Sequence, residues 1–281
     1  MDMHASICRP PDDPPRLLSD ADPAPVLIEN AEGRGPGVVV CDHGGRAVPA
    51  RMHGLGLEPA HFDRHIAWDI GALALARRLA RRFDMPLVSA AYSRLVIDVN
   101  RGEDDPTLIP EISDDVVIPA NRNLSVEDAA ARMRALFDPY HAAVAASLDS
   151  RRGLGVAAPA LLSAHSFTPV MRGFQRPWEI GVLWDGDPRL AVPLLEALRG
   201  RGGVTVGDNQ PYSGRGTLGG TVETHALPRG LPNVLLEVRQ DLIESAEGAA
   251  RWGDMLGDAL APILADPGLY QVELYPRLPA E

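Results

Sequence analysis

Short apolar runs alternate with helix-like segments along the chain from residue 37 to residue 264. Most of the apolar runs are only a few residues long and rich in β-branched side chains, which is typical of buried strands. The expected strands span residues 37–41, 86–88, 95–99, 161–165, 180–184, 204–206 and 234–238. The expected helices span residues 65–83, 125–148, 189–198 and 245–264. This alternation predicts an α/β fold, a three-layer α/β/α sandwich, with functional groups at the carboxyl ends of its strands.

Two of the expected helices carry specific signals. In the first, apolar residues recur near helical spacing and paired arginines mark the polar side, so Asp69 is expected in its first turns. These apolar residues are Ile66, Ile70, Leu73 and Leu79. In the second, Ser125 is a good N-cap, and Pro139 is expected to kink the helix before Tyr140.

The length of 281 residues allows one large α/β domain, with two smaller domains as the alternative. Residues 1–24 are rich in proline and acids and predict an irregular N-terminal arm rather than a signal peptide or membrane anchor. We expect residues 25–281 to form a single domain. Residues 103–123 contain three prolines without clear periodicity, which predicts a long loop of the kind that often covers a binding site.

Composition excludes several classes of function. The formal charge is −11, from 38 acidic and 27 basic side chains, and this disfavours nucleic acid and anionic membranes as partners. Every basic side chain is an arginine, so Schiff-base and Walker-type lysines are absent. Only Cys8 and Cys41 are present, which does not suggest a disulfide framework and fits a reducing cytoplasm.

Polar residues follow or interrupt the apolar runs in five places. These segments are residues 42–43, 94–101, 165–166, 209–212 and 237–239. Taken alone, a histidine at a strand end is more often a hydrogen-bonded structural residue than a ligand. Their joint occurrence favours function, because buried charged groups are costly unless they are paired, metal-bound or catalytic.

The same segments resemble the N-formylglutamate amidohydrolase family, a distant relative of the zinc carboxypeptidases and aspartoacylases. In chain order they read CDHGGRAVP (41–49), WDIG (68–71), YSRLVIDVNR (92–101), AHSF (164–167), NQPYSG (209–214) and LEVR (236–239). The resemblance spans roughly residues 25 to 265. It implies a mixed, mostly parallel sheet flanked by helices, and one Zn²⁺ per chain.

The resemblance implies a metal site at two histidines. His43 and His165 match the histidine ligands of the wider group, in which the first motif is His-x-x-Glu. Arg46 stands at the position of that glutamate and cannot bind a cation. Asp69 matches the common aspartate of the family, so we expect it to be the third ligand. Two histidines and a carboxylate leave a coordination position for water, as catalytic zinc requires.

Two arginine-containing segments are expected to handle negative charge. Asn100 and Arg101 resemble the pair that holds a substrate carboxylate, and Arg94 resembles the arginine that stabilises an oxyanion. A guanidinium suits both tasks because it can bind a carboxylate with two hydrogen bonds or offset charge developing on a carbonyl oxygen. Asp98 could orient either arginine or form a buried salt bridge.

The expected general base is Glu237, which would take a proton from water and pass it to the leaving nitrogen. Glu223 and His225 compete for this role because they lie in another polar segment flanked by glycines. Tyr212 and Arg239 are expected to contact substrate.

We therefore expect hydrolysis of the amide bond of a small N-acyl amino acid, with N-formyl-L-glutamate as the reference substrate. The first motif, Asp42–Arg46, differs from the Pro-His-Ser-Gly form of the histidine pathway, so a related N-acyl amino acid or another formamide is an alternative. A binding protein without metal is another alternative, because Arg46 replaces a ligand. A peptidase acting on peptide termini is the third, although residues 103–123 would restrict large substrates.

Overall fold

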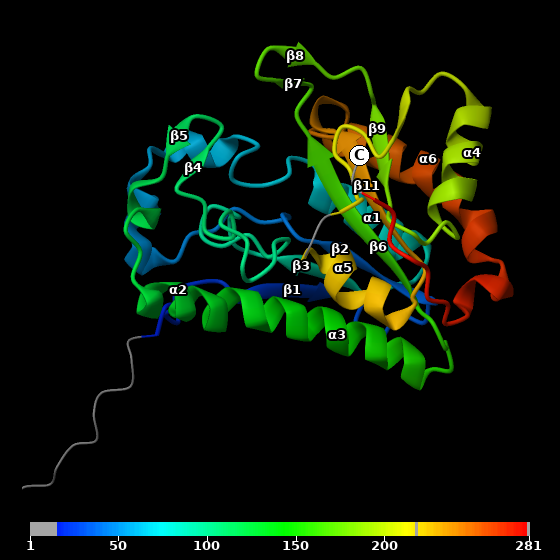
Figure 1. Cartoon of the computed structure of the whole chain (residues 1–281), viewed down its shortest axis with the longest axis horizontal. Coiled ribbons are helices and arrows are strands. Elements are labelled where there is room, and N and C mark those ends of the chain that lie inside the picture. Colours follow the sequence, from blue (N-terminus) through cyan, green and yellow to red (C-terminus); the bar gives the residue numbers. More distant parts are fainter. Residues whose placement is uncertain (1–15, 217–218, 280–281) are drawn as a thin grey trace, which may run out of the picture.

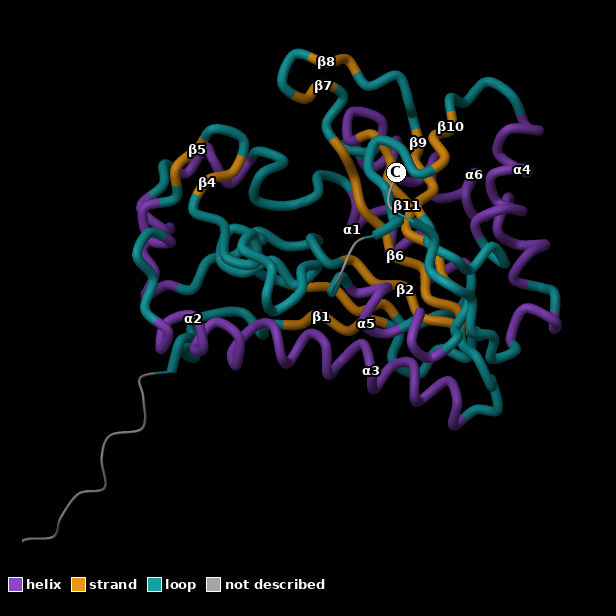
Figure 2. The backbone as a smooth tube through the Cα atoms, in the orientation of Figure 1, coloured by secondary structure: helices purple, strands orange, loops and turns teal. Residues whose placement is uncertain are grey.

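The computed structural model describes residues 16–216 and 219–279. A seven-stranded sheet with the order β1-β3-β2-β6-β11-β9-β10 forms its centre (Figures 1 and 2). The strands are β1 (Val26–Glu29), β2 (Gly37–Cys41), β3 (Leu87–Ala90), β6 (Ala160–Phe167), β9 (Ile180–Leu183), β10 (Val206–Asp208) and β11 (Asn233–Arg239). The pairs β1–β3 and β11–β9 are antiparallel and the other four are parallel, so the sheet is mixed and mostly parallel.

Helices cover both faces of this sheet. On one face lie α1 (Ala72–Arg82), α4 (Ala191–Arg201) and α6 (Ala246–Leu264), and on the other lie α3 (Asp138–Gly153) and the short α5 (Thr221–His225) (Figure 1). Strand β2 is buried on both sides: Val39 and Cys41 pack toward α1, whereas Val38 and Val40 pack toward α3. Apolar side chains on both faces are what a covered parallel strand requires. The predicted three-layer α/β/α sandwich is confirmed.

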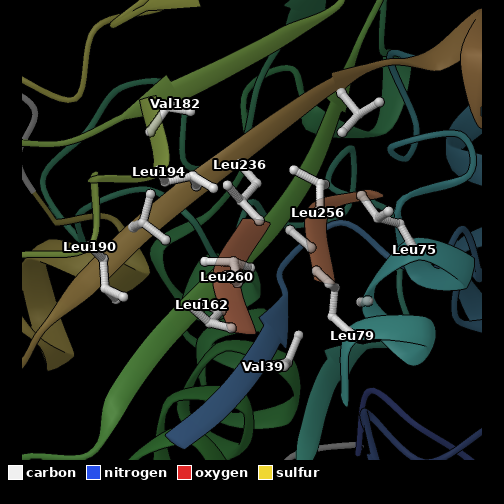
Figure 3. Packing of buried hydrophobic residues seen from close by; sticks show 14 of the residues in the cluster. Val39, Leu75, Leu79, Leu162, Val182, Leu190, Leu194, Leu236, Leu256 and Leu260 are labelled. Atoms are coloured by element: carbon white, nitrogen blue, oxygen red, sulfur yellow. The ribbon is translucent and has the colours of Figure 1, made fainter. Parts of the chain in front are cut away.

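The larger core lies between the sheet and the three helices α1, α4 and α6. Leu75 and Leu79 of α1 meet Leu256 and Leu260 of α6 above Val39 (Figure 3). All five side chains are fully buried. This core attaches α1, α4 and α6 to one face of the sheet. It therefore holds the strands in place, including the ends from which side chains project on the other face.

Leu79→Ala is expected to lower the free energy of unfolding by about 2–5 kcal/mol, because it removes buried apolar surface and leaves a cavity in close-packed surroundings. Urea denaturation of both proteins measures the loss. Val126→Ala is the matched control, because Val126 is 81% exposed at the start of α2 (Val126–Arg132) and its truncation removes almost no buried surface. Equal losses in the two variants would contradict this packing.

Two predicted elements were wrong. Residues 65–71, expected in the first helix, form turns, and α1 begins only at Ala72. Gly71 has φ +81°, and a Cβ there would lie 2.2 Å from the carbonyl oxygen of Ile243. Residues 95–99, expected as a strand, form a buried turn between the sheet and α3. A short apolar run cannot reveal whether it is a strand or a buried loop, because both are fully covered.

Other predictions agree with the structure. Residues 103–123 are mainly loop and contain a small hairpin, β4 (Ile112–Ser113) and β5 (Val116–Val117). The hydroxyl of Ser125 accepts a hydrogen bond from the backbone N–H of Asp128 and caps α2. At the expected kink, Met133–Phe137 form a π-helical turn just before Pro139.

Strand β1 has no counterpart among the predicted elements. The predicted N-terminal arm, residues 1–24, lies mostly outside the described residues, and the single domain of residues 25–281 stays a prediction. None of the helices described is both long enough and apolar enough to span a membrane.

Candidate metal-dependent active site

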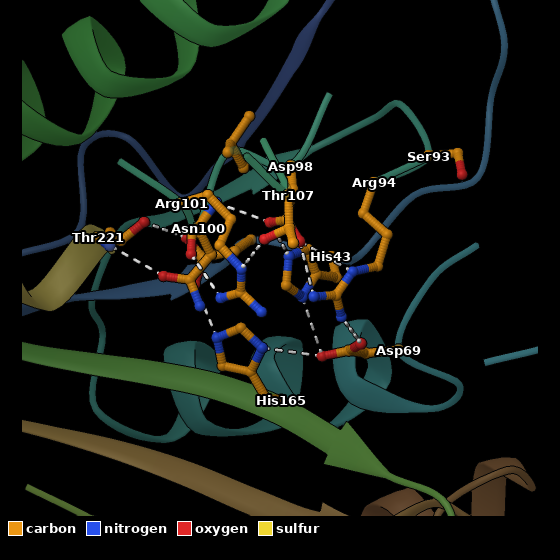
Figure 4. Close-up of polar contacts among 12 residues, drawn as sticks. His43, Asp69, Ser93, Arg94, Asp98, Asn100, Arg101, Thr107, His165 and Thr221 are labelled. Atoms are coloured by element: carbon orange, nitrogen blue, oxygen red, sulfur yellow. Dashed lines mark hydrogen bonds and ion pairs between the residues drawn. The ribbon is translucent and has the colours of Figure 1, made fainter. Parts of the chain in front are cut away.

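The parallel strands bring the predicted metal ligands to one edge of the sheet. His43 follows β2 and His165 lies near the end of its parallel neighbour β6. Alternation along β6 and β11 points His165 and Glu237 away from the core formed by α1, α4 and α6. Both side chains therefore face the loops that carry Arg94 and Asn100. Figure 4 shows the two histidines with Asp69 on one side and Asn100 on the other.

His43, Asp69 and His165 form a buried group of potential metal ligands. One ligand atom from each lies within 4.8 Å of the other two. Oδ2 of Asp69 is 2.8 Å from Nδ1 of His165 and 3.4 Å from Nδ1 of His43. Asp69 reaches this position because its backbone N–H donates to the carbonyl of His43. Two imidazole nitrogens and one carboxylate are the donor set of a catalytic zinc site, so these residues could bind a metal.

A buried carboxylate holds the second nitrogen of each histidine. Nε2 of His43 lies 2.7 Å from Asp98, and Nε2 of His165 lies 2.8 Å from Asp42. When each Nε2 donates its hydrogen to the carboxylate, the lone pair of Nδ1 is left facing Asp69 and its surroundings. Such carboxylate–histidine pairs are typical of metal sites, where they fix the tautomer and orientation of the ligand.

Four side chains hydrogen-bond the carboxylate of Asp42. Besides His165, it accepts hydrogen bonds from the hydroxyls of Tyr140 (2.6 Å), Ser163 (3.0 Å) and Thr221. These donors come from α3, β6 and α5, so Asp42 joins both helices of this face to the metal-ligand group. Tyr140 and Thr221 donate to Oδ1, whereas Oδ2 accepts from Ser163 and faces Nε2 of His165.

The electrostatics of the group fit a bound cation. Burial alone would raise the pKa of Asp69, but His43 and His165 hold it far below its usual range. Burial alone would lower the pKa of His165, but hydrogen bonds to Asp42 and Asp69 raise it well above its usual range. Among the described residues, the carboxylates of Asp69 and Asp98 pair with Arg94, whereas the carboxylate of Asp42 pairs with His165. A metal ion would replace the protons on the histidines and offset this surplus of negative charge.

Arg46 lies outside the metal-ligand group. Its guanidinium bonds the carboxylate of Asp63 and the carbonyl of Phe62 (3.2 Å), and it stacks over Trp68 at 5.2 Å. The side chain is 48% exposed. The arginine that replaces the usual glutamate therefore points away from the site, and Asp69 occupies the vicinity of the two histidines instead.

Arg46→Ala is expected to leave the metal content of the purified protein unchanged, because its side chain contacts none of the three potential ligands. Elemental analysis of the variant beside the wild type measures this. Arg51→Ala, which changes another arginine on the same stretch of chain, controls for the general loss of a positive charge. Loss of metal from the Arg46 variant alone would place Arg46 in the site.

Glu237 lies beside His165, since the two residues are Cα partners across β6 and β11. It is only 7% exposed, and its Oε2 has no hydrogen-bond partner among the described residues. Burial raises the pKa of Glu237 to about 7, and Asp69 also raises it. A carboxyl group with such a pKa can accept and return a proton near neutral pH. The position and the orphaned oxygen suit the predicted general base.

The predicted anion-binding residues lie on both sides of His43. Arg94 donates to Oδ2 of Asp98 through Nε (3.0 Å) and Nη2 (2.7 Å), and its Nη1 lies 3.4 Å from Asp69. The amide oxygen of Asn100 accepts from the backbone N–H of Thr221 at 2.9 Å. Asp98 thus orients Arg94 and His43 together.

Arg101 has no carboxylate partner within the part of the chain that the structure describes. Its Nη1 donates to the carbonyl of Asn100 (3.0 Å) and its Nε to the hydroxyl of Thr107 (3.2 Å). Both bonds go to neutral acceptors in the same loop. The guanidinium charge is therefore available to an anion that enters the site.

Of the two predicted substrate contacts, one lies near Glu237 and the other is occupied elsewhere. Burial raises the pKa of Tyr212, and the charge of Glu237 raises it further, so the phenol is close to that carboxylate. Arg239 instead pairs with Asp241 at 2.8 Å and bonds the carbonyl of Trp178. Its described partners place it beside the segment just before β9 rather than at the histidines.

The competing acid/base candidates lie in α5. His225 bonds Nδ1 of His141 at 2.8 Å, and burial lowers its pKa to about 4. The carboxylate of Glu223 and the amide oxygen of Asn100 both lie against Gly220. Neither competitor belongs to the group of potential metal ligands found among the described residues.

Three residues near the site were given no role in the sequence analysis. Asp42 could have been found, because it is an acid buried at the end of an apolar run and next to His43. Thr221 and Arg176 offered no local signal. Thr221 contacts Asp42, which lies 179 positions away in the sequence. Arg176 contacts Tyr212, and β9 and β10 lie between them in the sequence.

Comparisons with known proteins identify relatives of this chain. The family model for N-formylglutamate amidohydrolase matches residues 35–244. A solved gene product of Agrobacterium tumefaciens is 37% identical, with a TM-score of 0.85 over 89% of this chain and 98% of its own. An N-formylglutamate amidohydrolase from Ralstonia eutropha JMP134 is 22% identical, with a TM-score of 0.65 over 86% and 97% of the two chains. No curated protein matches the chain.

Proposed function

Because the chain belongs to the N-formylglutamate amidohydrolase family and is a hydrolase of non-peptide C–N amide bonds, we propose that it removes the acyl group from small N-acyl amino acids. N-formyl-L-glutamate is the reference substrate, and its products would be glutamate and formate. The reaction uses one metal ion, which we propose to be zinc, held by His43, Asp69 and His165.

The observation that carries this proposal is the placement of Glu237 beside His165. A buried carboxylate with an unpaired oxygen lies next to a two-histidine, one-aspartate group. A structural metal site has no need of such a neighbour, whereas a hydrolytic site needs a base within reach of water. When bound, the metal would lower the pKa of a water ligand and polarise the acyl carbonyl.

Two side chains of the site take part in the hydrolysis itself. Glu237 accepts a proton from the attacking water and returns it to the leaving nitrogen. Arg94, held in place by Asp98, offsets the negative charge that develops on the carbonyl oxygen. Three of the five N–H groups of Arg94 are engaged by Asp98 and Asp69, so two remain for this task.

Substrate orientation falls to the loop after Asp98. Arg101 binds the α-carboxylate of the amino acid, and Asn100 supplies a neighbouring amide that Thr221 fixes. Such positioning holds the acyl carbon near Glu237 and the metal ligands, which lowers the entropic cost of the attack. Tyr212 lines the same region.

Formate release from N-formyl-L-glutamate, measured with purified protein, tests the proposal. The protein is assayed as purified, after dialysis against a chelator, and after zinc is added back. We expect activity in the first and third samples and its loss in the second. Undiminished turnover after verified metal removal would contradict the metal dependence, and no turnover of any formyl or acetyl amino acid by zinc-loaded protein would contradict the reaction.

A further inference from the structure

Arg176 is a buried guanidinium at the border of this site. It follows the hairpin of β7 (Val170–Met171) and β8 (Phe174–Gln175) and is only 8% exposed. Its guanidinium lies over the rings of Phe167 (5.6 Å) and Tyr212 (4.8 Å). Within residues 16–216 and 219–279, no carboxylate pairs with it.

A comparison with the other buried arginines shows how unusual this is. Arg132 and Arg151 are also buried without a carboxylate, but each is surrounded by neutral acceptors. Arg132 donates to the carbonyls of Val96 and Ala120 and to the side chain of Asn121, and Arg151 donates to the carbonyls of Gly33 and Ala31 and to the hydroxyl of Ser150. In the described part of the chain, the Arg176 guanidinium has one backbone acceptor, the carbonyl of Thr168 (3.2 Å), and it also bonds the phenol of Tyr212. Its buried charge is the least compensated of the three.

Two neighbouring side chains place Arg176 next to the reaction centre. Arg176 lies over the ring of Tyr212, and the pKa of this phenol is raised by burial and by Glu237 and lowered by Arg176, so both charged groups act on it. The pKa of His65 is lowered by burial, and both Arg94 and Arg176 lower it further. Arg176 thus shares the neighbour Tyr212 with Glu237 and the neighbour His65 with Arg94.

We propose that Arg176 binds the side-chain carboxylate of the substrate and selects N-acyl amino acids with an acidic side chain. This inference rests on the proposed function. Arg101 and Arg176 are two guanidiniums of the site without a carboxylate partner among the described residues, and an acidic N-acyl amino acid brings two carboxylates. A guanidinium supplies a bidentate, charge-assisted pair to a carboxylate but not to the neutral amide of glutamine.

Ligand binding in a Glu237→Gln background tests this without turnover. Calorimetry compares N-formyl-L-glutamate with N-formyl-L-glutamine, which has nearly the same shape but no side-chain charge, on zinc-loaded protein. With Arg176 intact we expect the glutamate ligand to bind roughly 10–100-fold more tightly, as charge-assisted hydrogen bonds imply. Arg176→Met should bring the two affinities close together. Arg172→Met, which removes an exposed arginine from the same hairpin, should keep the preference.

Three results would overturn the role of Arg176. The preference for the glutamate ligand could survive Arg176→Met, or protein with Arg176 intact could show no preference. Arg176→Met could also weaken the binding of both ligands equally, which would mean that Arg176 only supports the hairpin. Arg176→Lys keeps the charge and should retain part of the preference, so it serves if the methionine variant does not fold. Formate release by the wild type is measured separately, so ligand selection without turnover would contradict the proposed function alone.

Discussion

Glu237→Gln is expected to lower kcat for N-formyl-L-glutamate by about 10²–10⁴-fold, the usual contribution of general acid–base catalysis. Glutamine has nearly the same shape as glutamate but cannot accept the proton of the attacking water. Glu237 is not one of the three potential metal ligands, so bound metal should stay unchanged. Steady-state kinetics and elemental analysis of the same preparation measure both quantities. A fall in kcat with a nearly unchanged KM would identify an interaction made in the transition state.

Glu223→Gln is the matched control for this variant. Glu223 is the competing carboxylate, and both it and the amide oxygen of Asn100 lie against Gly220. We expect its variant to keep most of the proton-transfer capacity. If Glu223→Gln loses kcat while Glu237→Gln does not, the roles of the two carboxylates must be exchanged.

His43→Ala and His165→Ala are each expected to abolish stable metal binding and, with it, turnover. Each change removes one of three potential ligands and also leaves a buried carboxylate, Asp98 or Asp42, without its imidazole partner. The loss of affinity should exceed the 10–100-fold that removal of an outer-shell partner such as Asp98 typically costs. Competition with a chelating dye measures the affinity.

His225→Ala provides the control for these two variants. His225 is also a buried histidine with a hydrogen-bonded ring, but its partner is His141 and it lies outside the ligand group. It should bind metal like the wild type. Metal retained by both the His43 and the His165 variants would contradict the site.

The fold could be predicted largely from the sequence because the central strands are short, β-branched and covered on both faces. β2, β6 and β11 lie where their apolar runs predicted them. The run at residues 95–99 is equally apolar, but its neighbours in space are α3 and the turn at residues 65–71. No strand of the described residues pairs with this run, and only the three-dimensional arrangement decides that. Strand β1 was missed because its pairing with β3 depends on residues some 60 positions away.

The three potential metal ligands were predicted from the family resemblance, and two of them also follow or end recognisable strands. His43 and His165 come together because β2 and β6 are parallel neighbours. Asp69 joins them although the predicted helix begins only at Ala72, since its backbone bond to His43 fixes it instead. Arg239 shares β11 with Glu237, but the sequence could not reveal that Asp241 would engage it. The local pattern of apolar residues predicts where a strand ends. Only tertiary contacts decide which of the side chains near that end reach the site.

A crystal structure of zinc-loaded protein, with anomalous diffraction recorded at the zinc edge, tests the central claim most directly. We predict one strong peak per chain, bonded to Nδ1 of His43, Nδ1 of His165 and a carboxylate oxygen of Asp69, with a carboxylate oxygen of Glu237 within reach of the open position. A peak bonded to other residues, or no peak in protein that contains stoichiometric zinc, would contradict it.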